Sequence, residues 1–410
     1  MLDSASAANY QTTDKNLSAK ISTNIDEIGA GEWNSLREYD SPFTRHEFLR
    51  ALEQNSCLHD YGWYPCHIVL RDKQGTLRAA LPLYIKTNNY GEFVFDWAWE
   101  QAYHSHGINY YPKMVSAIPY TPIVGERLLC RDDSYKDALI NVAIKVVEHQ
   151  TYSGVHWLFP NESDNLHLQK HRLAFRVDCQ YHWCNNAYHS FDDFLLTLRS
   201  KKRKMIQRER RLVREQKIAM KLLHGDEIST ELWQEIHGLY SSLFNVKSGV
   251  PTLSRAFFEE IGRTMPRNIV VALAMRDNQV IACAINLRST DTLYGRHWGV
   301  KDYHDCLHFE TCYYAGIEYC IRNGLERFEP GAQGAHKLAR GFLPTATQSA
   351  HWLAHSSFME AAIKFCEHEQ NAVTQYIEDS WSYLPYSDDA LPITKPEPAT
   401  TDTAQKPRDG

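Results

Sequence analysis

The sequence lacks the long apolar run that a membrane-spanning helix requires. None of its uninterrupted apolar stretches approaches the ~18 residues needed to cross a bilayer. The first ten residues also lack the order of a secretory signal, in which positive charges precede an apolar segment. We therefore expect a cytoplasmic protein with no membrane span.

Three sequence signatures of common enzyme classes are also absent. The chain has no nucleophile elbow, no phosphate-binding P-loop and no glycine-rich dinucleotide fingerprint. These absences argue against the hydrolases, nucleotide-hydrolysing enzymes and dehydrogenases that carry those signatures.

The cysteines and histidines do not follow a metal-binding pattern. The ten cysteines are scattered without a Cys-x-x-Cys pair, which is typical of buried thiols in a reducing compartment. His304, His308 and Glu310 lie close together but precede the expected helix and lack a strict ligand spacing. We expect neither disulfides nor a metal site.

The charge of the chain is uneven. Its 410 residues exceed one ordinary core, so we expect two domains. The net charge is -6, yet residues 199–217 contain ten Lys or Arg and only two Glu, a local charge of +8 that leaves -14 on the rest. A basic stripe on an acidic body favours a local anionic ligand over general coating of nucleic acid.

An internal repeat with a period of about 205 to 210 residues predicts a duplicated domain, because this period is too long for a solenoid. Residues 41–53 resemble residues 251–262, each with a capping Ser or Thr before an amphipathic helix. Residues 67–84 parallel residues 271–287, each with two apolar strands around a turn containing Arg-Asp.

The repeat continues beyond the hairpins. A third strand is expected at 89–99 and 292–299, followed by a helix at 110–117 and 308–323. A fourth strand is expected at 155–159 and 327–329. The predicted fold class is α+β, a mixed α/β arrangement in which mixed sheets carry flanking helices.

The predicted domain boundaries follow from composition. The two domains are expected at 23–186 and 223–386, joined by a basic helix at 187–222. The flanking residues 1–22 and 387–410 are polar and aperiodic, which is typical of disordered tails.

The basic connector is predicted as an amphipathic helix. Ser190 can cap its start, and two aspartates favour its first turn. Apolar residues fall on one face, opposite a row of Arg and Lys that includes Arg203 and Arg210. The row is either a solvated face or a site for a phosphate-bearing ligand, and the number of cations favours the ligand.

These features resemble the FemAB-type N-acyltransferases of the GNAT superfamily, which contain two tandem acetyltransferase-like folds. The resemblance covers about residues 41–385 and is closest to a bacterial subgroup described as peptidoglycan-biosynthesis-related. It rests on these motifs: Ser41-Pro-Phe, Phe48-Leu, Ala80-Leu-Pro-Leu-Tyr84, Phe95-Asp-Trp-Ala-Trp99, Tyr111-Pro-Lys113, Tyr294-Gly-Arg-His-Trp-Gly299, His308-Phe-Glu310 and Phe328-Glu-Pro-Gly-Ala-Gln-Gly334.

The resemblance implies transfer of an acyl or aminoacyl group to an amine. It also implies that Lys201, Arg203, Arg210 and Lys337 meet a phosphorylated substrate. Relatives usually carry an acidic residue where Ala335 stands, which weakens an acid or base role there. Neither copy has the usual loop for the pyrophosphate of coenzyme A. No cofactor is therefore required, although acyl-CoA remains a possible donor and tRNA a possible donor carrier.

Residues 329–342 contain the strongest candidates for catalysis. Glu329 ends a strand before a glycine loop and can accept a proton from an amine, or it can be a structural carboxylate that accepts loop N–H groups. His336 is a second candidate base, or an ordinary polar residue of the loop. Lys337 and Arg340 suit phosphate or carboxylate binding, or are surface charges. The loop residues expected to contact substrate are Gly331, Gln333 and Gly334.

Other candidate binding residues lie on helices and strands. Glu310 and Tyr314 share one helical face with Glu318, which can bind an amine or be solvated. Arg296 and Trp298 are expected on the same side of a strand, opposite His297. In the first copy the matching candidates are Asp96 and Trp99, which can bind a flat or sugar-like group or belong to the core.

The sequence therefore predicts an N-acyltransferase whose second domain and connector form the cleft. Two alternatives stay open. One is a binding module for a phosphorylated cell-wall precursor or RNA, and the other is a transferase that uses aminoacyl-tRNA as its donor.

Overall fold

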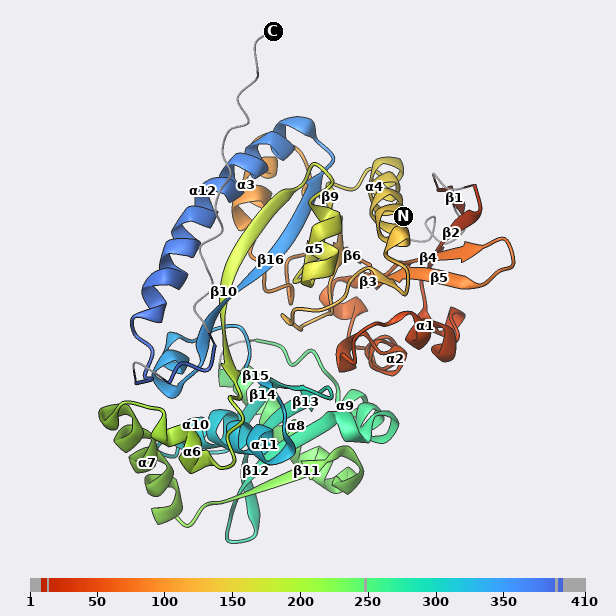
Figure 1. Cartoon of the computed structure of the whole chain (residues 1–410). Helices are drawn as coiled ribbons and strands as arrows, with labels where there is room; N and C mark the ends of the chain where they lie inside the picture. The colour runs from red at the N-terminus through yellow and green to blue at the C-terminus, as the bar shows by residue number, and fades with distance from the viewer. Residues whose placement is uncertain (1–8, 13–14, 247–248, 388–389, 394–410) are drawn as a thin grey trace.

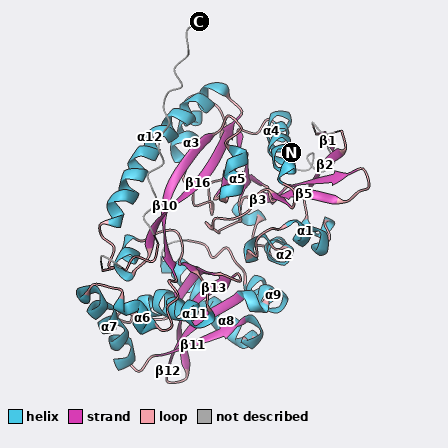
Figure 2. Cartoon of the chain, in the orientation of Figure 1, coloured by secondary structure: helices cyan, strands magenta, loops and turns pink. Residues whose placement is uncertain are grey.

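The computed structural model describes residues 9–12, 15–246, 249–387 and 390–393. The chain forms two mixed α/β halves, one above the other in Figure 1, with helices on both faces of the strands (Figure 2). Among the described residues, no helix is long and apolar enough to cross a membrane. All ten cysteines lie in this part of the chain as free thiols.

The first half contains a separate five-stranded sheet in the order β1-β2-β4-β5-β8. Its strands are β1 (Asn9–Gln11), β2 (Leu17–Ser22), β4 (His67–Asp72), β5 (Leu77–Leu81) and β8 (Leu129–Cys130). The expected tail at 1–22 is wrong for residues 9–11 and 17–22. Strand β1 pairs antiparallel with β2, and β2 pairs antiparallel with β4 and buries Ala19 and Ile21. Residues 1–8 and most of the expected C-terminal tail lie outside the described residues.

An 11-stranded sheet runs through both halves in the order β11-β12-β13-β14-β15-β10-β16-β9-β7-β6-β3. Its strands are β3 (Trp63–Pro65), β6 (Tyr84–Lys86), β7 (Lys113–Ser116), β9 (Gly154–Leu158), β10 (Ala174–Cys184), β11 (Ala219–His224), β12 (Ile269–Arg276), β13 (Gln279–Arg288), β14 (Thr292–Val300), β15 (Arg327–Glu329) and β16 (Leu343–Leu353).

Helices cover these sheets. They are α1 (Ala30–Leu36), α2 (His46–Gln54), α3 (Trp97–Ser105), α4 (Lys136–Gln150), α5 (Glu162–Leu168), α6 (Phe191–Leu196), α7 (Ser200–Glu215), α8 (Thr230–Val246), α9 (Arg255–Thr264), α10 (Leu307–Phe309), α11 (Ala315–Asn323) and α12 (Ser356–Trp381). A π-helical turn, η8 (Glu310–Tyr314), joins α10 to α11, and a 3-10 helix, η9 (Ala335–Arg340), precedes β16.

The two halves exchange strands where they meet. Strand β10 pairs antiparallel with β16 from Ala174 opposite His351 to His182 opposite Leu343. Strand β10 then continues along β15 of the second half, and β16 continues along β9 of the first half. Each half therefore completes its sheet with a strand from the other.

The repeat is confirmed where both copies carry a hairpin. Strands β4 and β5 pair antiparallel in the first copy, as β12 and β13 do in the second. The expected strands at 155–159 and 327–329 are β9 and β15, and the expected helix at 308–323 runs from α10 through η8 to α11.

Two elements of the first copy were predicted wrongly. Residues 89–99 form a loop and the start of α3, because Gly91 and Phe93 have positive φ values of 82° and 62°, which an extended strand does not permit. Residues 110–117 contain strand β7, which lies between β6 and β9 with all four side chains buried.

The connector is two helices rather than one. Ser190 caps α6 as predicted, since its Oγ accepts a hydrogen bond from Asp193 N at 3.1 Å. The helix ends at Leu196, and α7 begins at Ser200. The apolar face of α7 is buried at Ile206 and Val213, as its amphipathic pattern predicts.

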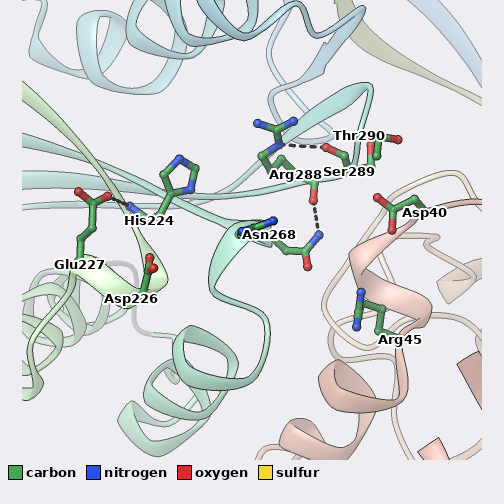
Figure 3. Close-up of a pocket in the computed structure, with 10 residues that line it drawn as sticks. Asp40, Arg45, His224, Asp226, Glu227, Asn268, Arg288, Ser289 and Thr290 are labelled. Carbon is green, nitrogen blue, oxygen red and sulfur yellow. Dashed lines mark hydrogen bonds between the residues drawn. The ribbon is translucent and has the colours of Figure 1, made fainter. Parts of the chain in front are cut away.

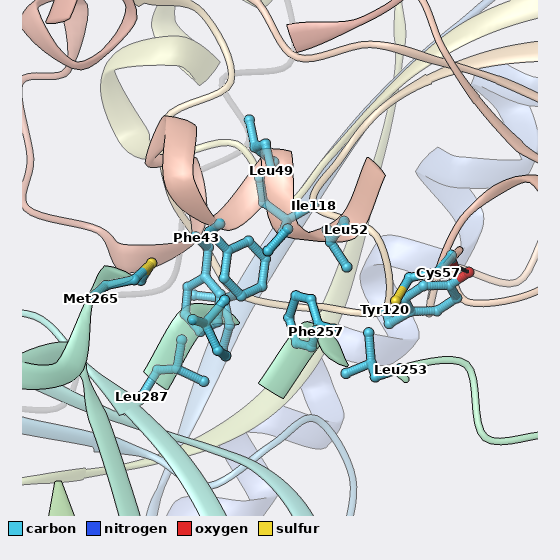
Figure 4. Close-up of a cluster of buried hydrophobic side chains, with 14 of the residues drawn as sticks. Phe43, Leu49, Leu52, Cys57, Ile118, Tyr120, Leu253, Phe257, Met265 and Leu287 are labelled. Carbon is cyan, nitrogen blue, oxygen red and sulfur yellow. Dashed lines mark hydrogen bonds between the residues drawn. The ribbon is translucent and has the colours of Figure 1, made fainter. Parts of the chain in front are cut away.

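A joint core holds the halves together (Figure 4). The equivalent helices of the repeat, α2 and α9, pack against each other, with the rings of Phe48 and Phe257 5.5 Å apart. The ring of Phe43 in the first half packs edge-on against the ring of Tyr294 in the second, with the ring centroids 5.2 Å apart. These residues belong to one continuous buried cluster.

We expect Phe257→Ala to destabilise the whole chain, because the Phe257 side chain is 1% exposed in this joint core. The loss should be about 3 to 5 kcal/mol, as for other large buried aromatic residues. Urea unfolding followed by circular dichroism measures it. Leu196→Ala is the control, since Leu196 is 66% exposed. Equal midpoints for the two variants would contradict a joint core.

Candidate active site

A cavity of about 420 Å³ lies between the two halves. The first half contributes the aromatic loop, defined as residues 89–97, together with Tyr120. The second half contributes Tyr240 and Phe244 from α8, Arg296 and His297 from β14, and Gly331 and Ala332 from the loop after β15. Most of the exposed lining is apolar, so the cavity suits an uncharged or flat group beside a few polar atoms.

Strands β14 and β15 separate at this cavity. They pair in parallel only from Thr292 opposite Arg327 to Tyr294 opposite Glu329. Past Glu329 the chain turns through Pro330, and Gly331 adopts a φ of 95°, a conformation that favours glycine. The gap between the diverging strands is therefore lined from both sides.

A bulge in β14 changes the predicted direction of its side chains. Ile285 of β13 pairs with His297 and the next residue pairs with Gly295, so Arg296 is the extra residue. Arg296 and His297 consequently both line the cavity. The expectation that Arg296 and Trp298 share a side is wrong, because Trp298 packs instead against a buried cluster around Val213 and the ring of His308.

Glu329 is a buried carboxylate at the point where the strands separate. Its side chain is 5% exposed, and the buried Oε2 atom has no hydrogen-bond partner. Burial raises the pKa of Glu329 to about 7, and the positive charges of Arg327 and Arg296 only partly oppose this shift. Its nearest charged or ionisable neighbours include His182 and Arg327, each 4.0 Å from Oε1. The loop N–H groups do not satisfy Oε2, which favours a base over a structural carboxylate.

The loop after Glu329 is held by its own side chains. Lys337 is 2% exposed, its Nζ donates to the carbonyl oxygen of Gly331 at 2.6 Å, and burial lowers its pKa to about 8. His336 is exposed, and its Nε2 lies 2.8 Å from the Tyr313 hydroxyl. Lys337 therefore shapes the cavity wall, whereas His336 contacts Tyr313 and is not among the lining residues of the cavity.

Arg340 forms an ion pair with Glu209 inside the protein. Its Nη2 donates to Oε1 of Glu209 on α7 at 2.8 Å, and its Nε donates to the Tyr314 hydroxyl at 3.0 Å. Tyr314 in turn donates to Glu209, and the guanidinium lies 3.4 Å from the ring centroid of Phe309. Arg340 and Tyr314 therefore fasten the loop to the connector.

Arg210 of the connector is bound in the same way. It donates to Glu310 at 2.9 Å and to Glu318 at 2.8 Å, and it lies 4.4 Å from the ring centroid of Phe191. The shared helical face of the two glutamates is as predicted, but both contact an arginine of this chain. Lys201 is exposed and Arg203 is partly exposed, near the start of α7.

The first-copy candidates lie inside the first half. Asp96 is 3% exposed and forms a salt bridge with Lys113. Trp99 is 7% exposed, with its ring 4.9 Å from that of His351. Neither lines the cavity between the halves, so their predicted contact with a substrate there is not supported by position.

Sequence reasoning missed the aromatic loop as a wall of the cavity. Its exposed aromatic side chains are Tyr90, Phe93, Phe95 and Trp97. Their alternation with polar and small residues was interpreted as a strand. The high number of aromatic residues close to Gly91 is the sequence signal that could have indicated a loop lining a cavity.

A second cavity of about 430 Å³ continues the first. The two share Phe93, Phe95 and Ala332, and the second is also lined by Gln333 and Gly334. The predicted loop residues therefore face a cleft that extends beyond the gap between β14 and β15.

A larger open hollow of about 720 Å³ lies elsewhere between the halves (Figure 3). Its side chains are largely engaged with the backbone: Asn268 donates to the Arg288 carbonyl at 2.8 Å, and Arg288 donates to the Ser289 carbonyl at 3.0 Å. Asp40 and Arg45 lie across it. The hollow offers mixed exposed charges without a buried titratable group, so we do not place the reaction there.

Within the described residues, no group of three or more His, Cys, Asp or Glu side chains is arranged to hold a metal ion. Glu310 of the suggested trio contacts Arg210 instead.

The raised pKa of Glu329 predicts that Glu329→Gln stabilises the protein at high pH. The folded state holds this proton up to about pH 7, whereas the unfolded chain loses it near 4.5, so folding stability falls as pH rises through that window. Above pH 7 the variant should be more stable by roughly 3 kcal/mol, and below pH 4.5 the difference should vanish. Urea unfolding at pH 4.5 and pH 8 measures it, with exposed Glu326→Gln as control. A difference independent of pH would contradict the assignment.

The chain was compared with known families and structures. Residues 24–388 match the FemAB-like family, described as peptidoglycan biosynthesis/recognition. A crystal structure of FemX matches 82% of this chain and 98% of its own, with 9% identity and a TM-score of 0.51. The C-terminal domain of a putative lysylphosphatidylglycerol synthetase from Agrobacterium fabrum matches 81% and 94%, with 8% identity and a TM-score of 0.50.

A tandem GNAT protein from the clavulanic acid biosynthesis pathway matches 83% of this chain and 99% of its own, with 11% identity and a TM-score of 0.45. A comparison with curated protein sequences gave no match. The fold is the expected mixed α/β fold, in which mixed sheets carry flanking helices. Because the family match spans nearly the whole described chain, the protein belongs to the FemAB-like family.

Proposed function

We propose that the protein is an N-acyltransferase that transfers an acyl or aminoacyl group from an activated donor to an amine acceptor in peptidoglycan-related metabolism. Membership of the FemAB-like family supports the acyltransferase role. The single observation that carries the proposal is Glu329, a buried carboxylate with its pKa raised to about 7. It stands where β14 and β15 separate beside a cavity lined from both halves.

The proposed reaction is direct attack of the amine on the donor carbonyl. The amine nitrogen forms a bond to the carbonyl carbon, the bond from that carbon to the leaving sulfur or oxygen breaks, and the leaving group takes up a proton. Glu329 accepts the proton lost by the amine, directly or through one water. A carboxylate whose pKa lies near neutrality suits this role, because it is ionised often enough to act and still binds the proton.

Stabilisation of the oxyanion is assigned to the bulge of β14. The extra residue of a bulge is left out of the strand ladder, and Arg296 is that residue beside the cavity, so its backbone N–H is the proposed donor. The Arg296 side chain donates to the Tyr120 carbonyl and thereby connects β14 to the first half. Arg296 of the bulge lines the cavity, and Glu329 lies at the end of the neighbouring strand, two residues before the lining residue Gly331.

The donor is proposed to be an acyl-CoA or an aminoacyl-tRNA. The second choice is favoured by the exposed cations of α7, which include Lys201, Lys204 and Arg208, since a polyanion binds such a surface through phosphate contacts. Binding to tRNA that weakens steeply with salt would support a tRNA-borne donor. Absence of tRNA binding at low salt would exclude aminoacyl-tRNA as the donor. A binding module for a phosphorylated cell-wall precursor or RNA is the non-catalytic alternative.

We expect Glu329→Gln to lower the transfer rate by about 10²- to 10⁴-fold, the usual contribution of a positioned base. Acetyl-CoA and an aminoacyl-tRNA serve as donors, a short peptide with a free lysine amine serves as acceptor, and mass spectrometry measures the acylated product. In the wild type, kcat/KM should rise with pH through about 7 as Glu329 loses its proton.

Glu326→Gln is the matched control, because Glu326 is an exposed carboxylate three residues earlier. It should keep the wild-type rate and pH profile. Equal rates for Glu329→Gln and the wild type would reject Glu329 as the base. Acceptor binding without product from either donor would favour the binding module.

The aromatic loop is expected to bind the substrate rather than to react with it. Trp97→Ala should raise KM roughly two- to ten-fold with little change in kcat, because an aromatic contact contributes about 0.5 to 1.5 kcal/mol. Steady-state kinetics with the same donor and acceptor measure this. Tyr303→Ala is the control, since Tyr303 is 86% exposed and lies away from the cavity lining. A change in kcat alone would contradict a binding role.

A further inference from the structure

A chain of hydrogen bonds runs through the interior of the first half from Ser349 to Asp96. Ser349 Oγ lies 2.8 Å from His351 Nε2, and His351 Nδ1 lies 2.8 Å from His156 Nδ1. His156 Nε2 lies 3.5 Å from the Tyr110 hydroxyl, which donates to Asp96 Oδ2 at 2.5 Å. All five side chains are at most 5% exposed.

The acidic end of this chain is ionised. Lys113 forms salt bridges with Asp96 and with Glu92 at a fully buried position. Burial raises the pKa of Asp96, but the charge and hydrogen bond of Lys113, together with the hydrogen bond from Tyr110, hold it below the ordinary value. An ionised carboxylate only accepts hydrogen bonds, so Tyr110 donates its proton to Asp96. The Tyr110 oxygen is then left to accept from His156.

The direction of the remaining bonds follows from this. Burial holds the pKa of His156 and of His351 well below the ordinary value, so each ring is neutral with one N–H. His156 donates from Nε2 to Tyr110, and its Nδ1 accepts. His351 therefore donates from Nδ1, and its Nε2 accepts the hydroxyl proton of Ser349. Every proton in the chain points from the serine toward the carboxylate.

Ser349 also lines a cavity of about 240 Å³. The cavity lies between β10, β16, α12 and the aromatic loop, with Phe95, Phe159 and Val373 among its apolar lining. Arg176 lines it too and is held by Glu369, to which its Nη2 donates at 2.7 Å. The space suits a small acyl chain, and the ion pair with Glu369 fixes the partly buried Arg176 guanidinium at its edge.

We propose that Ser349 is the nucleophile of a second site, which accepts the acyl group of an ester or thioester with a small acyl chain, and that His351 is its general base. The arrangement has the required order of nucleophile, base and orienting partner. His156, Tyr110 and Asp96 act as positioning residues, because they fix the His351 ring with Nε2 free to accept. The serine stands on strand β16 rather than on a strand-to-helix elbow, which explains why no nucleophile motif marks it.

The proposed reaction is balanced without a cofactor. Ser349 Oγ forms a bond to the carbonyl carbon while its proton passes to His351 Nε2. The bond from that carbon to the leaving sulfur or oxygen then breaks, and His351 returns the proton to the leaving group. Water attacks the acyl-serine in the second stage, with its proton passing through His351 to Ser349 Oγ as the ester bond breaks. The products are a thiol or alcohol and a carboxylic acid.

The test uses the full chain with methanesulfonyl fluoride and p-nitrophenyl acetate as probes. Intact mass and peptide mapping should find one sulfonyl group on Ser349, and p-nitrophenyl acetate should give a burst of nitrophenol. Ser349→Ala should lose both signals, and His351→Gln should lower the labelling rate by about 10²-fold or more. Tyr110→Phe should lower the acylation rate at saturating ester without changing the ester concentration that gives half of the maximal rate. A general loss of structure would change both quantities.

Ser356→Ala is the matched control. Ser356 is an exposed serine at the start of α12 and lines neither this cavity nor the two at the candidate active site. Its labelling at Ser349 should equal that of the wild type. Glu329→Gln should also be labelled normally, so failure of the proposed transferase function leaves this test intact. No adduct on wild-type Ser349 with the small sulfonyl fluoride, or wild-type labelling of His351→Gln, would overturn the proposal.

Discussion

The pairing of β10 with β16 is the constraint on which the other features depend. The two strands come from different halves, and each also pairs with a strand of the opposite half. A half separated from its partner would expose an unpaired sheet edge and lose the joint core around Phe257. The gap between β14 and β15 and the cavity between the halves are therefore fixed by one continuous sheet.

The pairing of β16 with β9 brings His351 beside His156, although they lie in different halves of the sequence. Strand β16 carries Ser349 and His351 from the second copy into the interior of the first. The hydrogen-bond chain to Asp96 consequently exists only in the assembled molecule. Duplication followed by strand exchange thus supplies contacts that a single copy could not contain.

The features that were predictable from the sequence are local. The capping by Ser190, the paired hairpins and the position of Glu329 at the end of a strand each depend on a few neighbouring residues, so periodicity and spacing identify them. The bulge at Arg296 was not predictable, because it is a mismatch of register between two strands. The aromatic loop was misread because alternating aromatic residues occur both in strands and on loops that line a cavity.

Charge patterning misled in a different way. The sequence counts cations but does not reveal which have partners within the chain. Arg210 and Arg340 both looked available for phosphate, yet each forms an ion pair with a glutamate that is distant in sequence. Glu310 pairs with Arg210, 100 residues away, and Glu209 pairs with Arg340, 131 residues away. The remaining exposed cations of α7 are the smaller set on which binding of a polyanion can rest.

Glu329 and Asp96 illustrate how one chain gives opposite tasks to two buried carboxylates. Lys113 contacts Asp96 directly, so that carboxylate stays ionised and can orient the hydroxyl of Tyr110. The arginine nearest Glu329 stands at 4.0 Å, too far for a hydrogen bond, and burial then dominates its pKa. The ammonium group bound to Asp96 opposes its protonation, whereas Glu329 has no cation within hydrogen-bonding distance. Asp96 and Glu329 are both buried, so the distance to the nearest cation is what distinguishes the orienting carboxylate, Asp96, from the proposed base, Glu329.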